Sequence, residues 1–505
     1  MQNPNENVKN VFLIGSTGFI GKVTLGMLLE RRDVDKVFIL IRPREKKSDF
    51  NTKVQNVMDR FQHLKTNPCL ASKACQQAFS DGRVIPVVGD LSLENLGLSA
   101  ADCDRMTALN HSNSSSNKSS TSLKEMLGYR TECDYDMEKG ITHIINLAAD
   151  VSFEKSLSEA VINNVGTSMN VWKFAKRCKH LRNFVHCSTA YVAPSHGKER
   201  DVNDIKERLH DISRLSNEYG DAMTIYNNIK RGLLNSKEKD LMTASGHNNS
   251  YAFSKYLTEN VLAEKCKGSI PLTIVRPSIV SVSLNFPAPG WTDSHDALNG
   301  PLALYGAGFL HTNIGNNGSL FDVVPCDYVA DRLISAAFET CSSQIEEKRV
   351  RIIHVTAGKQ NGIENPALWK IMEDFWHPHN RKKVILRPFL RQLDYMKMDK
   401  SIKKDTQHLL RIKLFLLLIG KRRLARKLEK IIPLLQKLPD LFGPFCYYRY
   451  DFLSENSIQD YYPTFNNKDY SHLICQGIHY YLLKRGEQSP DNREPKYGQR
   501  FKVVS

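Results

Sequence analysis

Two side chains four residues apart suggest chemistry at a carbonyl carbon. Tyr251 and Lys255 lie in a segment with a helical pattern, so they project from one face of the expected helix. A nearby ammonium group lowers the pKa of a phenol, and such a phenol can protonate or stabilise the oxyanion that forms when hydride reaches a carbonyl group. We therefore expect Tyr251 and Lys255 to be catalytic residues.

A third catalytic hydroxyl is expected where the fifth predicted strand ends. Residues 187–192 read CSTAYV, and ligands of open α/β sheets bind at the carboxyl ends of the strands. Thr189 is the predicted catalytic residue. Ser188 is the alternative, since an error of one residue in the register would exchange the two, and a purely structural hydroxyl also fits this position.

A glycine-rich turn joins the first predicted strand to a helix. Gly15, Gly18 and Gly21 fit the spacing that lets a backbone approach a pyrophosphate at a helix N-terminus. The same sheet edge should receive further residues after the third and fourth strands, although tight turns alone would also explain these sequences. The full set expected to contact a dinucleotide is Gly15, Ser16, Thr17, Gly18, Phe19, Ile20, Gly21, Asp90, Leu91, Ala148, Ala149, Tyr251 and Lys255.

The residue after the second predicted strand indicates which dinucleotide is bound. NAD-binding proteins usually place an acidic residue there to hold the ribose 2′-hydroxyl, whereas this chain has Arg42, followed by Pro43 and Arg44. A guanidinium group suits a 2′-phosphate. We therefore predict NADPH as the cofactor, with Arg42 as the main determinant and Arg44 as a helper, although either arginine can instead be a solvated loop charge.

The elements that must position these residues alternate along the chain. Short β-rich runs are separated for the most part by helical patterns, which predicts a parallel sheet with helices on both faces. The fold class is α/β, a Rossmann-type doubly wound parallel sheet with a substrate-binding extension and a C-terminal helical domain. The predicted strands are residues 11–14, 37–41, 84–88, 143–147, 183–187 and 272–276.

Two changes in composition divide the chain. Residues 110–122 are almost wholly Asn and Ser, and we expect a disordered surface insertion within a first domain of residues 1–380. Residues 381–505 form the predicted C-terminal helical domain. Basic residues alternate with Leu and Ile through 409–438, so this stretch can lie on an anionic membrane, or it can be a core helix with a solvated face. The basic residues that support this prediction, one of them upstream of the stretch, are Lys404, Lys413, Lys421, Arg422, Arg423, Arg426, Lys427 and Lys430.

Charge and cysteine usage narrow the possible partners. The net charge of +16 favours anionic partners, but the sequence shows no nucleic-acid-binding motif, and it does not indicate an oligomeric state. The 11 cysteines are scattered, which indicates neither a metal site nor a disulfide framework and favours an intracellular, reducing compartment. The polar first residues run straight into an apolar strand, so we expect no signal peptide. The longest apolar candidate, residues 414–419, is far shorter than the roughly 18 residues that a span needs, so we expect no membrane-spanning segment.

These motifs together resemble the extended short-chain dehydrogenase/reductases, and further stretches resemble their alcohol-forming fatty acyl-CoA reductase branch. The resemblance covers nearly the whole chain, including a C-terminal part that single-domain epimerases lack. The stretches that carry it are residues 148–154 (AADVSFE), 276–280 (RPSIV), 289–293 (PGWTD), 299–301 (NGP), 324–329 (VPCDYV), 354–358 (HVTAG), 448–456 (YRYDFLSEN) and 480–484 (YYLLK).

The resemblance implies reduction of a long-chain acyl-CoA by NADPH to a primary alcohol and CoA, through an aldehyde that the enzyme holds. It adds Pro277 to the cofactor contacts and implies that the charged, helical segment 198–249 helps to form the acyl or CoA site. It also implies peripheral contact with a peroxisomal or endoplasmic reticulum membrane. The alternatives are a ketone or sterol reductase, an aldehyde-releasing reductase, or an inactive NADP-binding scaffold protein.

Overall fold

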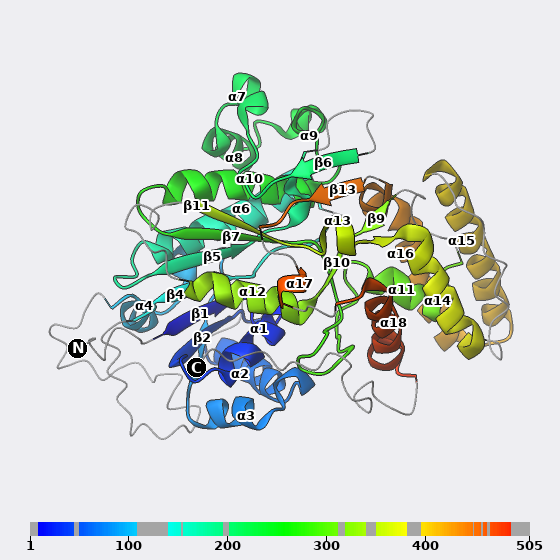
Figure 1. The fold of residues 1–505 in the computed structure, drawn as a ribbon, viewed down its shortest axis with the longest axis horizontal. Helices are drawn as coiled ribbons and strands as arrows, with labels where there is room; N and C mark the ends of the chain where they lie inside the picture. Colours follow the sequence, from blue (N-terminus) through cyan, green and yellow to red (C-terminus); the bar gives the residue numbers. More distant parts are fainter. Residues whose placement is uncertain are drawn as a thin grey trace.

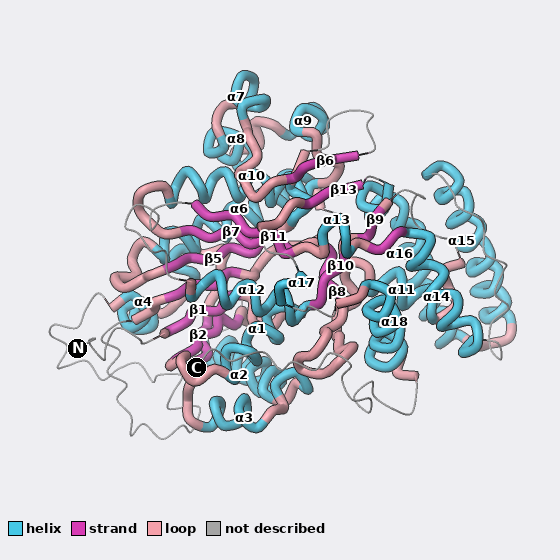
Figure 2. The backbone as a smooth tube through the Cα atoms, in the orientation of Figure 1, coloured by secondary structure: helices cyan, strands magenta, loops and turns pink. Residues whose placement is uncertain are grey.

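The computed structural model of the chain is built around a seven-stranded parallel sheet (Figures 1 and 2). It describes residues 9–44, 50–108, 140–152, 155–194, 201–311, 319–339, 350–380, 395–447, 449–455, 458–461 and 465–485. The strand order is β11-β7-β5-β4-β1-β2-β3. The strands are β1 (Asn10–Ile14), β2 (Lys36–Ile41), β3 (Val84–Val88), β4 (His143–Asn146), β5 (Asn183–Cys187), β7 (Leu272–Pro277) and β11 (Val350–Val355).

The predicted doubly wound sheet is confirmed, and all six predicted strands are present within one residue at each end. The seventh strand, β11, pairs with β7 and was not predicted as a strand. The crossover direction reverses between β1 and β4, and the register pairs Ile14 with Asn146. The turns that follow these two strands therefore meet at one edge of the sheet, where open α/β sheets bind their ligands.

Helices cover both faces of the sheet, and two separate apolar clusters fill the space beneath them. On one face α1 (Phe19–Glu30), α2 (Phe50–Lys65), α3 (Lys73–Ser80) and α12 (Cys326–Phe338) pack on the strands. On the other face lie α4 (Ala100–Thr107), α6 (Leu157–Ala175) and α10 (Ser250–Cys266). Alternate strand residues such as Leu13 and Phe12 belong to opposite clusters, as the two-residue period of a strand requires.

The segment between β5 and α10 forms an extension above α6 and α10 (Figure 1). It contains α7 (Ser213–Tyr219), α8 (Ala222–Lys230) and α9 (Glu238–Ser245). The helical pattern predicted for residues 198–249 agrees with these helices but does not indicate β6 (Asp201–Ile205), which pairs in parallel with β13 (Arg449–Phe452). The partner strand lies more than 240 residues away along the chain, so the local sequence pattern does not indicate this pairing.

The remaining elements lie beyond the carboxyl ends of the strands, on one side of the sheet in Figure 1, and they share its apolar cluster through residues such as Trp376 and Tyr470. The boundary predicted at 380/381 and the insertion at 110–122 fall at or within residues that the structure does not describe. These elements are β8 (Ile279–Ser281), α11 (Asn299–Gly306), β9 (Leu320–Phe321), β10 (Val323–Pro325), α13 (Gly358–Asn361), β12 (Ile363–Glu364), α14 (Asn365–Asn380), α15 (Tyr395–Leu418), α16 (Arg422–Tyr447), α17 (Ile458–Tyr461) and α18 (Asn467–Gly477).

Candidate active site

The glycine-rich turn lies between β1 and α1, against the turn that follows β4. Gly15 has a φ of +90°, and a Cβ atom there would lie 2.9 Å from the amide nitrogen of Ala148. A Cβ atom on Gly21 would lie 2.0 Å from the carbonyl oxygen of Gly15. Only glycine fits at these two positions, and the N-terminus of α1 is left open to an anionic group because Gly18 carries no side chain.

The other predicted dinucleotide contacts follow the neighbouring strands. Ala148 and Ala149 come directly after β4, and the amide of Ala148 donates a 3.2 Å hydrogen bond to the Asn146 side chain. Asp90 and Leu91 follow β3, where the Asp90 carboxylate accepts hydrogen bonds from the backbone and the hydroxyl of Ser92 (2.9 and 2.7 Å). The structure thus places these predicted contacts at the carboxyl edge of the sheet.

Three arginines gather beyond the end of β2. Arg42 and Arg44 are exposed, as expected for residues that would meet a phosphate group. Arg60, on α2, is half-buried, and its guanidinium group donates a hydrogen bond to the Arg42 carbonyl oxygen. Burial, together with the positive charges of Arg44 and Arg42, lowers the pKa of Arg60. A bound anion would relieve the repulsion among the three.

The predicted catalytic residues meet where α10 crosses the end of β5. Asn249 begins this helix by accepting a 2.7 Å hydrogen bond from the amide of Ala252, which places Tyr251 and Lys255 in its first two turns. Lys255 is 2% exposed, and its ammonium group donates a 2.7 Å hydrogen bond to the Cys187 carbonyl oxygen. The helix that carries the phenol is therefore fixed to the strand that precedes the predicted hydroxyls.

Both candidate hydroxyl groups lie in the turn after β5, beside β7. The Ser188 amide donates to the Val275 carbonyl oxygen at 2.7 Å, and the Thr189 side chain lies 3.5 Å from the Pro277 carbonyl oxygen. Thr189 also accepts a hydrogen bond from the Tyr191 amide at 3.3 Å. The buried Ser188 hydroxyl has no hydrogen-bond partner among the described residues. Both residues therefore stay candidates for the catalytic hydroxyl.

Burial controls the protonation of Tyr251 and Lys255, the predicted catalytic pair. It raises the pKa of Tyr251 above the ordinary value for a phenol, and the nearby Cys187 thiol adds to the rise. Burial also lowers the pKa of Lys255. The pKa of the phenol is thus raised and not lowered, because burial is the largest of its causes. Tyr251 is held in its protonated form, which is the form that a proton donor needs.

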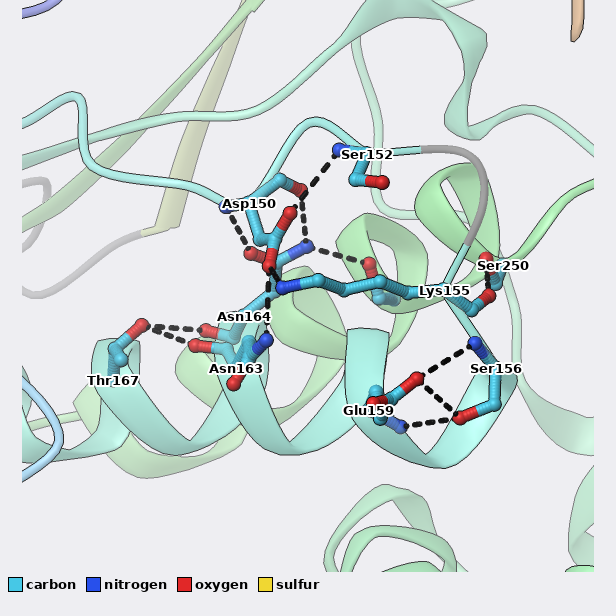
Figure 3. Close-up of polar contacts among 10 residues, drawn as sticks. Asp150, Ser152, Lys155, Ser156, Glu159, Asn163, Asn164, Thr167 and Ser250 are labelled. Atoms are coloured by element: carbon cyan, nitrogen blue, oxygen red, sulfur yellow. Dashed lines mark hydrogen bonds and ion pairs between the residues drawn. The ribbon is translucent and has the colours of Figure 1, made fainter. Parts of the chain in front are cut away.

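A hydrogen-bond network fixes the loop that follows Ala149 to the helix that carries Tyr251 (Figure 3). Asn164, on α6, binds both backbone groups of Asp150, and its amide also donates to the Ser254 hydroxyl at 2.8 Å. The Asp150 carboxylate accepts hydrogen bonds from Lys155 and from Asn163. Two residues of the same motif, 153 and 154, lie outside the described residues. The network thus links the turn after β4, where a dinucleotide is predicted to bind, to α10.

The stretch at 289–293 fastens onto the glycine-rich turn. Phe19 stacks on Trp291 with ring centroids 5.7 Å apart, and Lys22 forms an ion pair with Asp293. Trp291 is 3% exposed, so the two segments pack without solvent between them. The arrangement ties the segment that precedes α11 to the first turn of α1.

Several of these residues could not be identified from the sequence. Arg60 and Asn164 occupy ordinary helix positions, and their partners lie 18 and 14 residues away, beyond any helical repeat. For Arg60 the sequence of α2 gives only a weak indication. An arginine on the sheet-facing side of a helix needs an anionic or carbonyl partner, but the sequence does not show which one. Among the described residues, no three His, Cys, Asp or Glu side chains are placed to hold a metal ion.

Comparison with known proteins identifies the family of the chain. An NAD-binding family described as male sterility protein matches residues 13–111 and 123–333. Fatty acyl-CoA reductase 1 of Arabidopsis thaliana is 26% identical over 400 residues, which cover 75% of this chain and 72% of that protein. Fatty acyl-CoA reductase wat of Drosophila melanogaster is 26% identical over 338 residues, or 67% of this chain and 56% of that protein. The chain thus spans 56–72% of the length of these two relatives.

Two solved structures share the fold at low sequence identity. The terminal R domain from the myxalamid PKS-NRPS biosynthetic pathway has a TM-score of 0.59 at 16% identity and covers 95% of this chain and 92% of its own. A thiolation-reductase di-domain from an archaeal non-ribosomal peptide synthetase has a TM-score of 0.51 at 15% identity, with 94% and 75% covered. The predicted resemblance is confirmed: the chain belongs to the NAD-binding male sterility protein family, and its curated relatives are named fatty acyl-CoA reductases.

Proposed function

We propose that this chain reduces long-chain fatty acyl-CoA with NADPH to the primary alcohol and CoA, through an aldehyde that stays bound. The observation that carries the proposal is the meeting of three features at one sheet edge. These are the glycine-rich turn after β1, the hydroxyl-bearing turn after β5, and the half-buried Tyr251 with the buried Lys255 on α10. The names of the relatives supply the acyl-CoA substrate.

The residues at this edge fit a phosphorylated dinucleotide. A nicotinamide dinucleotide supplies hydride when it is bound. The open N-terminus of α1 suits the pyrophosphate, and Arg42, with Arg44 and Arg60 behind it, suits a 2′-phosphate. The further residues that would hold the cofactor are Gly15, Ser16, Thr17, Gly18, Phe19, Ile20, Gly21, Asp90, Leu91, Ala148, Ala149, Lys255 and Pro277.

The protein's own part in the reaction is to hold and move a proton at the substrate oxygen. Tyr251, which is protonated because partial removal from solvent raises its pKa, donates a hydrogen bond to the carbonyl oxygen as negative charge develops there. Thr189, or Ser188 in its place, provides a second donor. Lys255 orients the site through its bond to the Cys187 carbonyl oxygen, and its charge stabilises the oxyanion. At the aldehyde stage the phenol proton passes to the product alcohol.

The stoichiometry of the reaction tests the proposal most directly. Conversion of a thioester to an alcohol takes up four electrons, so two NADPH are oxidised for each CoA thiol released. We would incubate the full chain with palmitoyl-CoA and NADPH. The loss of NADPH absorbance, the free CoA thiol and the extracted lipid products are measured on the same samples. Tyr251→Phe serves as the control, because it removes the proton donor and leaves the glycine-rich turn unchanged.

Each alternative activity gives a different result in the same assay. A ratio near one with aldehyde trapped by a hydrazine reagent would identify an aldehyde-releasing reductase. Oxidation of NADPH with ketones or sterols but no thiol release from acyl-CoA would identify a ketone or sterol reductase. Cofactor binding without turnover of any of these substrates would identify an inactive scaffold protein.

A further inference from the structure

Helices α15 and α16 form an antiparallel hairpin at one edge of the molecule (Figure 1). Gly420, with a φ of +73°, makes the tight turn between them. The first half of α15 contacts the rest of the protein, because Asp405 accepts a 3.1 Å hydrogen bond from the backbone amide of His311. Across the hairpin, Lys413 and Glu429 form an ion pair at 3.1 Å.

One face of the hairpin is packed in the manner of an ordinary core helix. Along α16 the buried side chains recur every three or four residues, which makes a single apolar stripe. On α15, Ile402 and Leu409 are buried in the same way. The alternative of a core helix with a solvated face thus describes α16 well. The buried stripe consists of Ala425, Leu428, Ile432, Leu435 and Leu438.

The end of the hairpin differs, because its large apolar side chains face solvent. We define the hairpin tip as residues 410–424. Of the fourteen exposed large hydrophobic side chains in the described part of the chain, eight lie on α15, α16 or the turn between them. An apolar patch of this kind on a protein surface marks a contact with a partner or a membrane. Those of the tip are Leu410 (46% exposed), Leu414 (60%), Phe415 (59%), Leu417 (45%), Leu418 (78%), Ile419 (46%) and Leu424 (45%).

Positive charge surrounds this apolar tip. Residues 411–430 contain eight Lys and Arg side chains and one acidic side chain, Glu429, which gives a net charge of 8 − 1 = +7. Seven of the eight basic side chains are exposed, and Lys413 is half-buried. The exposed ones are Arg411, Lys421, Arg422, Arg423, Arg426, Lys427 and Lys430.

We propose that the hairpin tip docks onto an anionic lipid bilayer. The leucines and Phe415 would enter the boundary between headgroups and acyl chains, while the basic side chains bind lipid phosphates. Pairing of two copies through this surface would bring two charges of +7 together, which disfavours a second copy as the occupant. No helix in the described part of the chain is long and apolar enough to cross a membrane.

Vesicle flotation with the full chain tests the proposal. Vesicles of phosphatidylcholine alone are compared with vesicles that contain about a third phosphatidylserine, at low and high salt. The apolar variant is Leu414→Ser with Leu418→Ser, and its control is Leu93→Ser with Leu233→Ser, at leucines 54% and 63% exposed on other parts of the surface. All four side chains are exposed, so these changes should leave the fold intact.

A charge variant and its control complete the design. Lys421→Glu with Arg423→Glu reverses two tip charges, and Lys237→Glu with Lys239→Glu reverses two exposed charges beside and on α9. We expect salt-sensitive binding to anionic vesicles only. Either tip variant should weaken it by about tenfold or more, and neither control should change it more than about twofold.

Three results would overturn the proposal. They are no flotation of the intact chain with anionic vesicles, equal flotation with neutral vesicles, and binding that both tip variants retain. A dimer in sedimentation experiments that dissociates in the Leu414/Leu418 variant, with no vesicle binding, would assign the tip to self-association. Reductase activity on a micellar substrate is measured in parallel, so failure of membrane docking is distinguished from failure of the proposed function.

Discussion

Replacement of Arg42 by alanine tests whether this residue binds the 2′-phosphate of NADPH or is only a solvated charge on a loop. Arg42 follows β2 at the sheet edge, and its carbonyl oxygen is held by Arg60 from α2. NADPH and NADH differ at this point only by the phosphate group. The variant should therefore weaken NADPH binding and leave NADH binding almost unchanged, because the lost interaction is one that only NADPH makes.

The expected size of the effect on NADPH binding follows from the exposure of Arg42. A hydrogen bond to a charged group contributes about 1.5–3 kcal/mol net, and Arg42 is exposed, so the lower end applies. About 1.5 kcal/mol corresponds to roughly a tenfold rise in the Kd for NADPH. Arg44→Ala should have a smaller effect. Arg60→Met should weaken NADPH binding to a similar degree as Arg42→Ala, because it removes a nearby charge and the bond that holds the Arg42 backbone.

Fluorescence titration of each variant with NADPH and NADH, at two salt concentrations, measures these effects. Arg423→Ala, at an exposed arginine of the distant helix α16, controls for the general loss of positive charge. The difference between the two cofactors should shrink as salt screens the exposed guanidinium groups. Equal losses for NADPH and NADH in Arg42→Ala would refute the assignment, as would a loss of the same size in the control.

Further predictions concern the catalytic hydroxyl and the stability of the fold. Of Thr189→Val and Ser188→Ala, we expect the first to lower kcat by about two orders of magnitude with little change in cofactor Kd, and the reverse ranking would move the role to Ser188. Glu259→Gln leaves the Arg276 guanidinium, 0% exposed, without its carboxylate partner, and should cost about 3–5 kcal/mol in urea denaturation. A loss below about 1 kcal/mol would show that solvent reaches the pair. Burial and the Arg276 charge lower the pKa of His354 from 6.5 to about 4, so the unfolded chain binds this proton first as the pH falls. Stability should thus be lower by about 2 kcal/mol per such histidine at about pH 5 than at neutral pH, and a His354→Gln variant whose pH profile matches the parent would contradict this.

The parts of the fold that could be predicted are those with a local signal. Each of the six predicted strands is an apolar run flanked by turn residues, and the glycine spacing identifies the turn after the first of them. The seventh strand, β11, lies at the edge of the sheet and begins with Val350 and the charged Arg351, which are both half-exposed. A strand with one free edge does not need the continuous apolar run of a central strand, so its pattern is weaker.

The protonation of the site could not be predicted from residue types alone. Four-residue spacing correctly places Tyr251 and Lys255 on one face of a helix that crosses the end of β5. The direction of the phenol pKa depends on the balance of burial against charge, however, and burial is a property of the tertiary structure. The same holds for Arg60 and Asn164, whose roles come from partners on other elements.

The C-terminal part of the chain also contributes to the site, in a way that no local pattern shows. Tyr191, two residues after Thr189, packs edge-on against Tyr450 and Phe452 of β13, with ring centroids 5.0 and 5.4 Å apart. β13 pairs with β6, and Glu207, just beyond β6, accepts a 2.6 Å hydrogen bond from the His354 amide on β11. The turn that holds the candidate hydroxyls is therefore supported by β13, which lies about 260 residues further along the chain (450 − 191 = 259 and 452 − 191 = 261). Loss of residues 449–455 would remove the packing behind that turn, so the C-terminal region is needed for the geometry of the active site as well as for the hairpin that it carries.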